Sequence, residues 1–412
     1  MSVAYDLRSP AFIADPFPTL AEMRRDDPVH WSDSLGGWVL TRHDDVRQGL
    51  RDKRLSSDRI RPFVDHLDGE DRALVDELGE SLSHWAVFND PPVHTRLRGL
   101  MNKAFTTRAI QGLRPNIQGI VDDLLDKVEA AGRMDVIRDF AYPLPATVIA
   151  DMLGVPRRDV DNLKKWSDDL GTFVLTSRVN PDKYRLAAHG IREMTEYFQD
   201  LIAERERNPG SDVTSGLIEA HLEGDRLTAE EMVSNCILLL FAGHETTTHL
   251  IGNGLYALLT HPEQLADLKE NWQDQALVQN AVEEILRWDG PSLAGVRVAG
   301  EDVEIRGKRI KKGERLFLFN AAAGRDPALF PDPDRFDIRR KEAGRHVNFG
   351  YGIHFCIGAP LARLEGEIAL TTMMRRFDDW ALEQPTLDWS DSIIVRGVHA
   401  LNVSFRPVKQ AA

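Results

Sequence analysis

The chain contains very little cysteine: only Cys236 and Cys356 among 412 residues. Two cysteines so far apart do not form a disulfide framework, which favours a reducing compartment. Excess positive charge is also lacking, because the formal net charge is −14 and the pI is near 5.4. We therefore expect no nucleic-acid partner, since phosphate binding needs a basic face. A locally basic patch would still allow an acidic protein to dock.

Long apolar runs and linkers are absent too. No apolar run approaches the ~18 residues that a membrane span requires. The N-terminus has no charged segment followed by an apolar core, as a signal peptide would have. We therefore expect no membrane association and a cytoplasmic location. No repeat, low-complexity segment or Pro/Gly/Ser linker marks a boundary, so residues 1–412 are predicted to form one domain.

The periodicity of apolar residues indicates a mainly α fold. A helical period dominates from about residue 95 to residue 288. Strand-like pieces are short and lie near the ends, at 37–43, 296–310, 315–320 and in ALNVSFRP close to the C-terminus. Turns that contain glycine join the middle pieces, which predicts small antiparallel β-sheets beside a helix-rich domain.

Cys356 lies in a glycine-rich stretch, NFGYGIHFCIGAPLAR, that opens a helix. Gly350 and Gly352 permit backbone turns that other residues resist, and Pro360 suits the first turn of a helix. A cysteine just before a helix N-terminus is stabilised as a thiolate, which would serve as a nucleophile or a metal ligand. Neighbouring phenylalanines favour an apolar cofactor over a peptide substrate. A buried structural cysteine is the simpler alternative.

A second stretch, residues 227–264, predicts one helix of about 30 residues, or roughly 45 Å. Thr228 and Glu231 form a capping box, and Pro262 ends the pattern. The helix is apolar except for AGHETTTH in its middle, where buried polar groups would be costly. Glu245 and Thr246 are therefore an acid–alcohol pair able to move protons beside a small ligand. A capped bend or a solvent-facing patch is the alternative.

Two further pairs are ambiguous when taken alone. Glu284 and Arg287 lie three residues apart on one helical face, as many surface ion pairs do. His94 and Arg98 are spaced i, i+4 after a Pro-Pro helix start and would clamp an anionic group. A basic solvated face explains the second pair equally simply.

Together and in this order, these stretches resemble the soluble bacterial members of the cytochrome P-450 superfamily, over essentially all 412 residues. The matching motifs are F-G-x-G-x-H-x-C-x-G at 349–358, AGHETT at 242–247 and E-x-x-R at 284–287, and Arg335 also matches. The resemblance implies the P-450 fold, with haem b between the long distal helix and the helix after the cysteine loop. It also implies a single catalytic domain, 1–412, with no fused reductase.

The resemblance assigns roles to the motif residues. Cys356 would be the thiolate ligand of the haem iron, which favours O–O cleavage. The remaining cofactor residues would hold the haem propionates or pack against the ring; they are His94, Arg98, Arg297, Phe349, His354 and Gly358. Glu284, Arg287 and Arg335 would form a structural ion network. Glu245 and Thr246 would deliver protons through water during oxygen activation.

The activity that the resemblance implies is insertion of one oxygen atom from O2 into a hydrophobic small molecule, most simply as hydroxylation. Electrons would come from an external ferredoxin and an NAD(P)H-dependent reductase. The ferredoxin would dock on the face around Cys356, where the candidate positive charges are Lys103, Arg108, Arg345 and Arg363. The substrate pocket would be lined by mostly apolar side chains: Trp85, Val87, Phe88, Phe173, Val174, Leu239, Ala242, Leu293, Ala294, Val296, Ile393 and Ile394.

Two rival functions stay open at this point. A peroxygenase would use hydrogen peroxide directly, although the Glu245–Thr246 pair argues for O2 because peroxide brings its own protons and electrons. A haem-binding sensor would perform no oxidation and would need no such pair. On the same helix we expect Cys236 to be a packed core residue and His244 to pack between helices.

Overall fold

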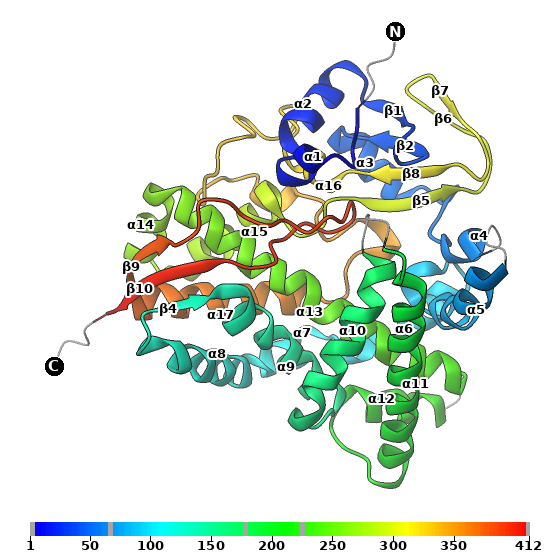
Figure 1. Ribbon diagram of the computed structural model, residues 1–412, viewed down its shortest axis with the longest axis horizontal. Coiled ribbons are helices and arrows are strands. Elements are labelled where there is room, and N and C mark those ends of the chain that lie inside the picture. Colours follow the sequence, from blue (N-terminus) through cyan, green and yellow to red (C-terminus); the bar gives the residue numbers. More distant parts are fainter. Residues whose placement is uncertain (1–4, 65–68, 176–179, 223–226, 409–412) are drawn as a thin grey trace. The chain divides into compact units, whose positions relative to one another are not determined.

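The computed structural model describes residues 5–64, 69–175, 180–222 and 227–408 (Figure 1). The α-helices are α1 (Pro10–Ala14), α2 (Phe17–Asp26), α3 (His43–Arg51), α4 (Ile60–Val64), α5 (Gly69–Ser83), α6 (Val93–Ala104), α7 (Thr107–Gly112), α8 (Arg114–Glu129), α9 (Pro143–Leu153), α10 (Val160–Val174), α11 (Lys183–Arg207), α12 (Val213–Leu222), α13 (Ala229–Thr260), α14 (Pro262–Glu270), α15 (Gln275–Asp289), α16 (Asn320–Gly324) and α17 (Ala359–Arg376). The predicted mainly α class is confirmed.

Short helices of other types and short strands complete the chain. The former are η1 (Ala86–Phe88), η2 (Ile137–Ala141), η3 (Arg157–Asp159), η4 (Ala343–Arg345) and η5 (Gly352–His354). The strands are β1 (Val29–Ser32), β2 (Gly37–Leu40), β3 (Leu55–Ser56), β4 (Arg133–Asp135), β5 (Gly295–Ala299), β6 (Val303–Ile305), β7 (Lys308–Ile310), β8 (Arg315–Leu318), β9 (Phe377–Leu382) and β10 (Asn402–Pro407).

The antiparallel pairing predicted for the middle strands is confirmed by β5 with β8 and by β6 with β7. The five-stranded sheet, ordered β1-β2-β8-β5-β3, also contains one parallel pair, which the prediction of antiparallel sheets did not include. Strand β2 pairs with β8 in parallel, with Trp38 opposite Leu316. A local turn joins only antiparallel neighbours, so this pairing, between segments nearly 280 residues apart, left no local signal. The strand expected at 37–43 is also shorter, because β2 ends at Leu40 and α3 begins at His43.

The long helix was predicted closely. The Thr228 hydroxyl accepts from the N–H of Glu231 at 3.2 Å, and a Glu231 carboxylate oxygen accepts from the N–H of Thr228 at 3.0 Å. This capping box precedes the 32 residues of α13, and Pro262 occupies the first turn of α14. The box satisfies two backbone N–H groups at the start of α13, where Thr228, Ala229 and Glu230 are exposed.

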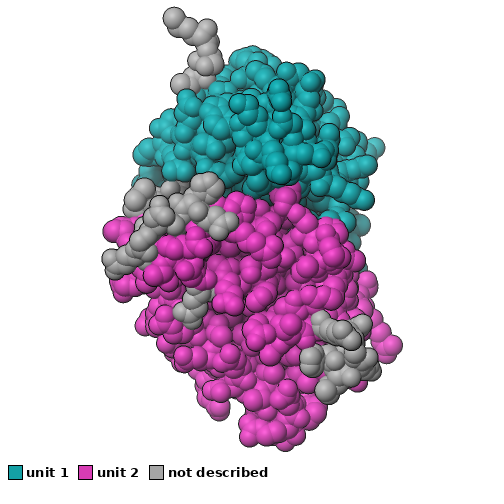
Figure 2. Space-filling model, turned by 90° about the vertical axis from the view of Figure 1, so that its right-hand side faces the viewer, with its two compact units in different colours: residues 1–55, 111–145, 245–412 teal, residues 56–110, 146–244 magenta. Residues whose placement is uncertain are grey.

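By its internal contacts the chain divides into two compact units, coloured separately in Figure 2. Unit 1 comprises residues 1–55, 111–145 and 245–412, and unit 2 comprises residues 56–110 and 146–244. Because their segments alternate along the sequence, no single linker separates them. The single catalytic domain stays a prediction.

Candidate active site

The loop that carries Cys356 is shaped by two glycines. Gly350 and Gly352 have φ angles of 72° and 77°, in the left-handed region that favours glycine. The N–H of Cys356 donates to the carbonyl of Phe349 at 2.9 Å, which closes the loop. Gly358 then caps α17 with an ordinary φ of −79°. The cysteine therefore precedes the helix by three residues, and its side chain is partly exposed.

The middle of α13 is a partly exposed notch in a buried helix. Ala242 is exposed and Glu245 and Thr246 are half-buried, whereas the helix residues on both sides are largely buried. Gly243 is needed for packing within unit 2, because a Cβ there would lie 2.8 Å from Ile149. In the residue order of the helix, His249 comes one turn after Glu245, with its Nε2 3.4 Å from a Glu245 carboxylate oxygen.

His244 and Cys236 behave as the sequence predicts. The Nδ1 of His244 lies 2.8 Å from the Leu240 carbonyl and its Nε2 lies 3.5 Å from the Ser167 hydroxyl, so the ring packs within unit 2. Cys236 is fully buried, and its sulfur is 4.0 Å from the Thr214 hydroxyl. Burial raises the pKa of the Cys236 thiol to about 12, which leaves it an inert core residue.

The ion network around Glu284 requires a correction. The Glu284 carboxylate accepts from the Nε and Nη2 of Arg287 at 2.6 and 2.7 Å, as expected for the pair. The second cation, however, is the buried Arg340, whose Nε donates to Glu284 at 3.2 Å. Arg335 is exposed and contributes its backbone carbonyl, which accepts from Arg287 at 3.1 Å. The loop after Arg335 turns the side chain five residues later inward, which the motif did not reveal.

In unit 2, His94 and Arg98 lie on the same face of α6. His94 is buried and Arg98 is half-buried, with its Nε donating to Asn102 at 3.1 Å. Burial, and then the neighbouring Arg98 cation, lower the pKa of His94, because both disfavour an imidazolium ion. An anion between the two side chains would reverse the second effect.

The other predicted propionate residues belong to unit 1. Arg297 is buried on β5, and its Nη1 donates to the carbonyl of Val296 at 2.9 Å. His354 ends the short helix η5 directly before the cysteine loop closes, and it is partly exposed.

The pocket residues predicted in unit 2 form two aromatic groups. Trp85 and Phe88 are buried and stacked, with ring centroids 5.7 Å apart, and the Trp85 ring also lies 5.7 Å from that of Phe241. Leu239 is buried and Val87 is exposed. Phe173, on α10 with Val174, contacts two aromatic rings that the sequence did not single out: Phe63 at 5.5 Å and Tyr184 at 5.9 Å.

In unit 1 the structure brings the two remaining pocket segments together. The N–H groups of Leu293 and Ala294 both donate to the Ile394 carbonyl, at 2.9 and 3.3 Å. These residues share one apolar cluster with Val296 and Ile393. Segments about 100 residues apart in the sequence thus pack into one buried apolar cluster.

Comparison with known proteins agrees with this arrangement. Residues 63–388 match the family model described as cytochrome P450. The chain is a cytochrome P450. It is 41% identical over 409 residues to the cytochrome P450 monooxygenase PikC of Streptomyces venezuelae, covering 97% of this chain and 93% of that protein. It is 40% identical over 409 residues to the vitamin D(3) 25-hydroxylase of Pseudonocardia autotrophica, covering 98% and 97%.

The solved structures include P450BioI in complex with an acyl carrier protein ligated to hexadec-9Z-enoic acid. That structure superimposes with a TM-score of 0.89 at 35% identity, over 96% of this chain and 99% of that one. The cytochrome P450 fold and the haem-thiolate monooxygenase activity predicted from the motifs are therefore confirmed. Like other members of the family, this cytochrome P450 uses haem b.

The described residues fit that cofactor. Ile353 and Phe355 flank the cysteine loop with 49% and 40% of their surface exposed, although such side chains are usually buried. In unit 2, Val87 and Val93 are likewise exposed beside His94. Apolar side chains next to cationic ones suit a flat apolar ring with anionic substituents, and a thiolate is a suitable donor for its iron.

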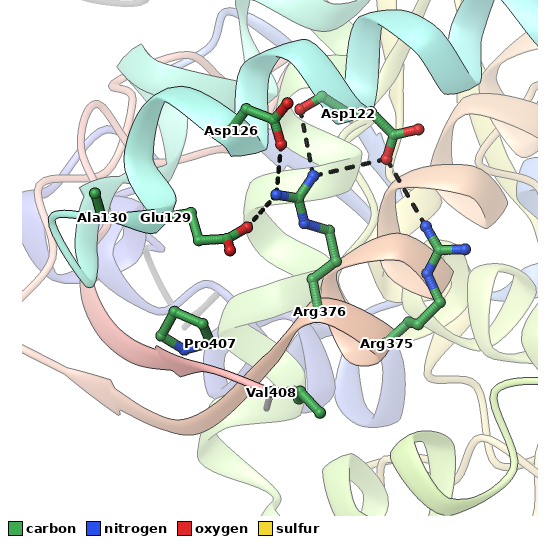
Figure 3. A pocket seen from close by; sticks show the side chains of 8 residues that line it. All are labelled: Asp122, Asp126, Glu129, Ala130, Arg375, Arg376, Pro407 and Val408. Atoms are coloured by element: carbon green, nitrogen blue, oxygen red, sulfur yellow. Dashed lines mark hydrogen bonds and ion pairs between the residues drawn. The ribbon is translucent and has the colours of Figure 1, made fainter. Parts of the chain in front are cut away.

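A surface hollow in unit 1 is lined by none of the predicted site residues. It has a volume of about 1150 Å³ between α8, the end of α17 and the end of β10. Figure 3 shows Arg376 among Asp122, Asp126 and Glu129, with Arg375 on the Asp122 side. Its open, salt-bridged lining does not suit an apolar substrate.

Among the described residues, no helix combines the length and hydropathy that a membrane crossing would demand.

The predicted docking cations Lys103, Arg108 and Arg345 are exposed. Arg363 differs from them, because it forms a bidentate pair with Glu283 and stands 4.6 Å above the Phe349 ring. Its charge is largely committed within the protein.

Proposed function

We propose that this cytochrome P450 hydroxylates a hydrophobic, mainly neutral small molecule with one oxygen atom from O2. The observation that carries this proposal is the notch of α13, where a partly exposed carboxyl group and a hydroxyl group stand side by side in an otherwise buried helix. An acid–alcohol pair is useful where protons must be delivered, as the reduction of O2 demands.

The chain's own residues would divide the work. Cys356 would hold the haem iron through its sulfur, and His94, Arg98, Arg297 and His354 would hold the propionates by charge and hydrogen bonding. When bound, the haem supplies oxygen activation and oxygen transfer. Glu245 would pick up a proton at its carboxylate, and the Thr246 hydroxyl would accept it and pass it on.

The apolar linings support a large substrate. The described pocket residues of both units are apolar, and a polar group on the substrate would find few partners among them. One relative is named as a vitamin D(3) 25-hydroxylase, and vitamin D(3) is a large apolar molecule. We therefore propose steroid-, terpenoid- or aromatic-sized compounds ahead of small acids.

The first test is the absorption spectrum of the reduced protein under carbon monoxide. We expect a strongly red-shifted Soret band in the wild type and in Cys236→Ala, the matched control that removes the other cysteine thiol. Cys356→Ser should lose the red shift, because an oxygen ligand cannot supply a thiolate. An unshifted wild-type band would overturn the assignment of Cys356. Screening steroids and terpenoids for spin-state changes would then test the substrate class.

Electrons would come from a small acidic ferredoxin and its NAD(P)H-dependent reductase, partners that would place the reaction in the cytoplasm. The exposed cations Lys103, Arg108 and Arg345 would guide docking through long-range attraction. Arg345→Glu should slow the first electron transfer about three- to tenfold at low salt, without weakening substrate binding. Arg309→Glu, on the β6–β7 hairpin, is the control. Equal rates in both variants would refute the docking proposal.

The alternatives predict different behaviour. A peroxygenase would turn over equally well with hydrogen peroxide alone, and a sensor would consume no reduced nicotinamide when a substrate is added. Incorporation of labelled oxygen from O2 into product, coupled to nicotinamide oxidation, would exclude both. The partly exposed Glu245–Thr246 pair favours that outcome.

A further inference from the structure

One face of α13 carries polar side chains beyond the notch. Glu245, His249 and Asn253 are each four residues apart, so they lie one above another on the helix. The side chains of Glu245 and His249 are 27% and 9% exposed, and Asn253 is buried. The row therefore leads from the partly exposed notch into the interior of unit 1.

His249 is unusual within this row. Its Nε2 lies 3.4 Å from a Glu245 carboxylate oxygen, within ion-pair reach but longer than a typical hydrogen bond. Among the described residues, neither ring nitrogen makes a hydrogen bond. Burying an imidazole without a partner is costly, and an adjacent carboxylate offsets that cost most effectively when the ring is protonated. Glu245 is therefore the group that makes a histidine acceptable here.

The surrounding loop leaves the ring little freedom. A Cβ added to Gly397 would lie 1.9 Å from the Nδ1 of His249, so only glycine leaves space for the imidazole. The same loop is fastened to α13 by Asn253, whose Nδ2 donates to the carbonyls of Arg396 and Asp289 at 3.0 Å each. Unit 1 thus encloses the ring on the side away from Glu245.

The other charged groups next to this row neutralise each other. Arg396, on the loop, donates from its Nε to Asp289, at the end of α15, at 2.7 Å. Both side chains are buried. Tyr256, two turns further along α13, has its pKa raised by burial and then by Asp289. Asp289 is thus engaged by Arg396, whereas a carboxylate oxygen of Glu245 lies 3.4 Å from the His249 ring.

We propose that His249 is a positioning residue for the acid of the proton-delivery pair. Its imidazolium pairs with the Glu245 carboxylate, fixes the orientation of that carboxylate beside Thr246 and keeps it ready to accept a proton. This role rests on the proposed function of Glu245, while the ion pair itself can be tested separately.

The pair is tested first by thermal unfolding of the haem-loaded protein. The variants are His249→Asn, Glu245→Gln and the double variant. We expect His249→Asn to lower the Tm by about 1–3 °C, and by less than half as much when Glu245 is already Gln. Additive losses would overturn the pairing whether or not the enzyme is active. His30→Asn is the matched control, since it breaks another buried histidine–carboxylate pair, His30 with Asp27 at 2.9 Å; its loss should be the same in both backgrounds.

The role is tested by comparing two oxidants, with testosterone as the probe substrate. With O2 and a ferredoxin system, His249→Asn should lower the product formed per nicotinamide oxidised about three- to tenfold, release the balance as hydrogen peroxide and leave KM unchanged. With added hydrogen peroxide, which brings its own protons, the rate should stay within about twofold of the wild type. An equal loss with both oxidants would mean that His249 acts only in packing and would refute the proposal.

These experiments distinguish the role of Glu245 in proton delivery from the positioning role of His249. If Glu245→Gln leaves coupling to O2 unchanged, the proposed function of the acid–alcohol pair fails. If Glu245→Gln uncouples the reaction but His249→Asn does not, that function stands and the positioning role fails. His249→Lys gives a further check, because the positive charge of lysine should restore part of the coupling that His249→Asn loses.

Discussion

Two glutamates of unit 1 share the same burial but have opposite surroundings. Glu284 on α15 and Glu365 on α17 are 0% and 1% exposed, on helices that pack against each other. Glu284 accepts from two nitrogens of Arg287, from the Nε of Arg340 and from the N–H of Asp337. Neither oxygen of Glu365 finds a hydrogen-bond partner among the described residues.

The contrast shows that donors, as well as burial, decide what it costs to bury a carboxyl group. Four donors compensate the lost hydration of Glu284, so it serves as the hub of a hydrogen-bonded network. Burial raises the pKa of Glu365 well above its ordinary value, because no donor among the described residues offsets the lost hydration. Glu283 lies between these cases: burial raises its pKa, but hydrogen bonds from His346 and Arg363 outweigh burial and lower it to about 2.

The largest expected effect comes from breaking the Glu284 hub. Arg287→Ala leaves a buried carboxylate short of two donors, which should cost about 3–5 kcal/mol of unfolding free energy. Arg340→Ala should cost less but clearly more than Arg335→Ala, since only Arg340 reaches Glu284 with its side chain. Urea unfolding of the haem-loaded variants measures this order. An Arg335→Ala loss as large as that of Arg340→Ala would contradict the assignment.

Replacing Glu365 should change the unfolding free energy in the opposite direction. Glu365→Met keeps an unbranched side chain of similar size and removes a polar group that makes no hydrogen bond. We expect a gain of about 1–3 kcal/mol in unfolding free energy at neutral pH. Glu367→Met, two residues along α17, is the control, because Glu367 pairs with Arg114 at 2.9 Å and should lose stability. A loss of stability in Glu365→Met would reveal a partner for this carboxyl group.

Glu365 should also make the unfolding free energy depend on pH. Because the pKa of Glu365 is raised on folding, the native state keeps a proton that the unfolded chain releases above its ordinary pKa of 4.5. Its stabilising contribution is complete below pH 4.5 and is lost as pH rises toward the raised value, by up to ~1.4 kcal/mol per pH unit. Glu365→Gln should therefore flatten the curve of unfolding free energy against pH above 4.5. Parallel curves for the two proteins would refute a neutral Glu365.

The smallest expected effect concerns Glu283. Its pKa is lowered to about 2, so the pair stabilises the protein above pH 4.5 and loses this contribution as pH falls toward 2. Arg363→Met should cost up to about 1 kcal/mol, because the arginine is 37% exposed, and should shrink the loss in acid. Arg375→Met on the same helix, with Asp122 3.8 Å away, is the control. Equal acid unfolding curves for both variants would contradict the role of Arg363.

Much of this protein was predictable because the decisive patterns are local. The glycines around Cys356, the capping box of Thr228 and Glu231, and the three-residue spacing of Glu284 and Arg287 act within one loop or helix turn. Each imposes its geometry on neighbours in the sequence, so no knowledge of distant segments is needed. The family and the mainly α class follow from these patterns.

The tertiary structure decided what depends on distant segments. The parallel pairing of β2 with β8, the choice of Arg340 over Arg335 and the space that Gly397 leaves for His249 each join segments that no local pattern connects. Glu365 shows the same limit, because only the packed surroundings of α17 remove water from it and supply no donor in return. The sequence determined which chemical groups are present, and packing determined which of them are charged and paired.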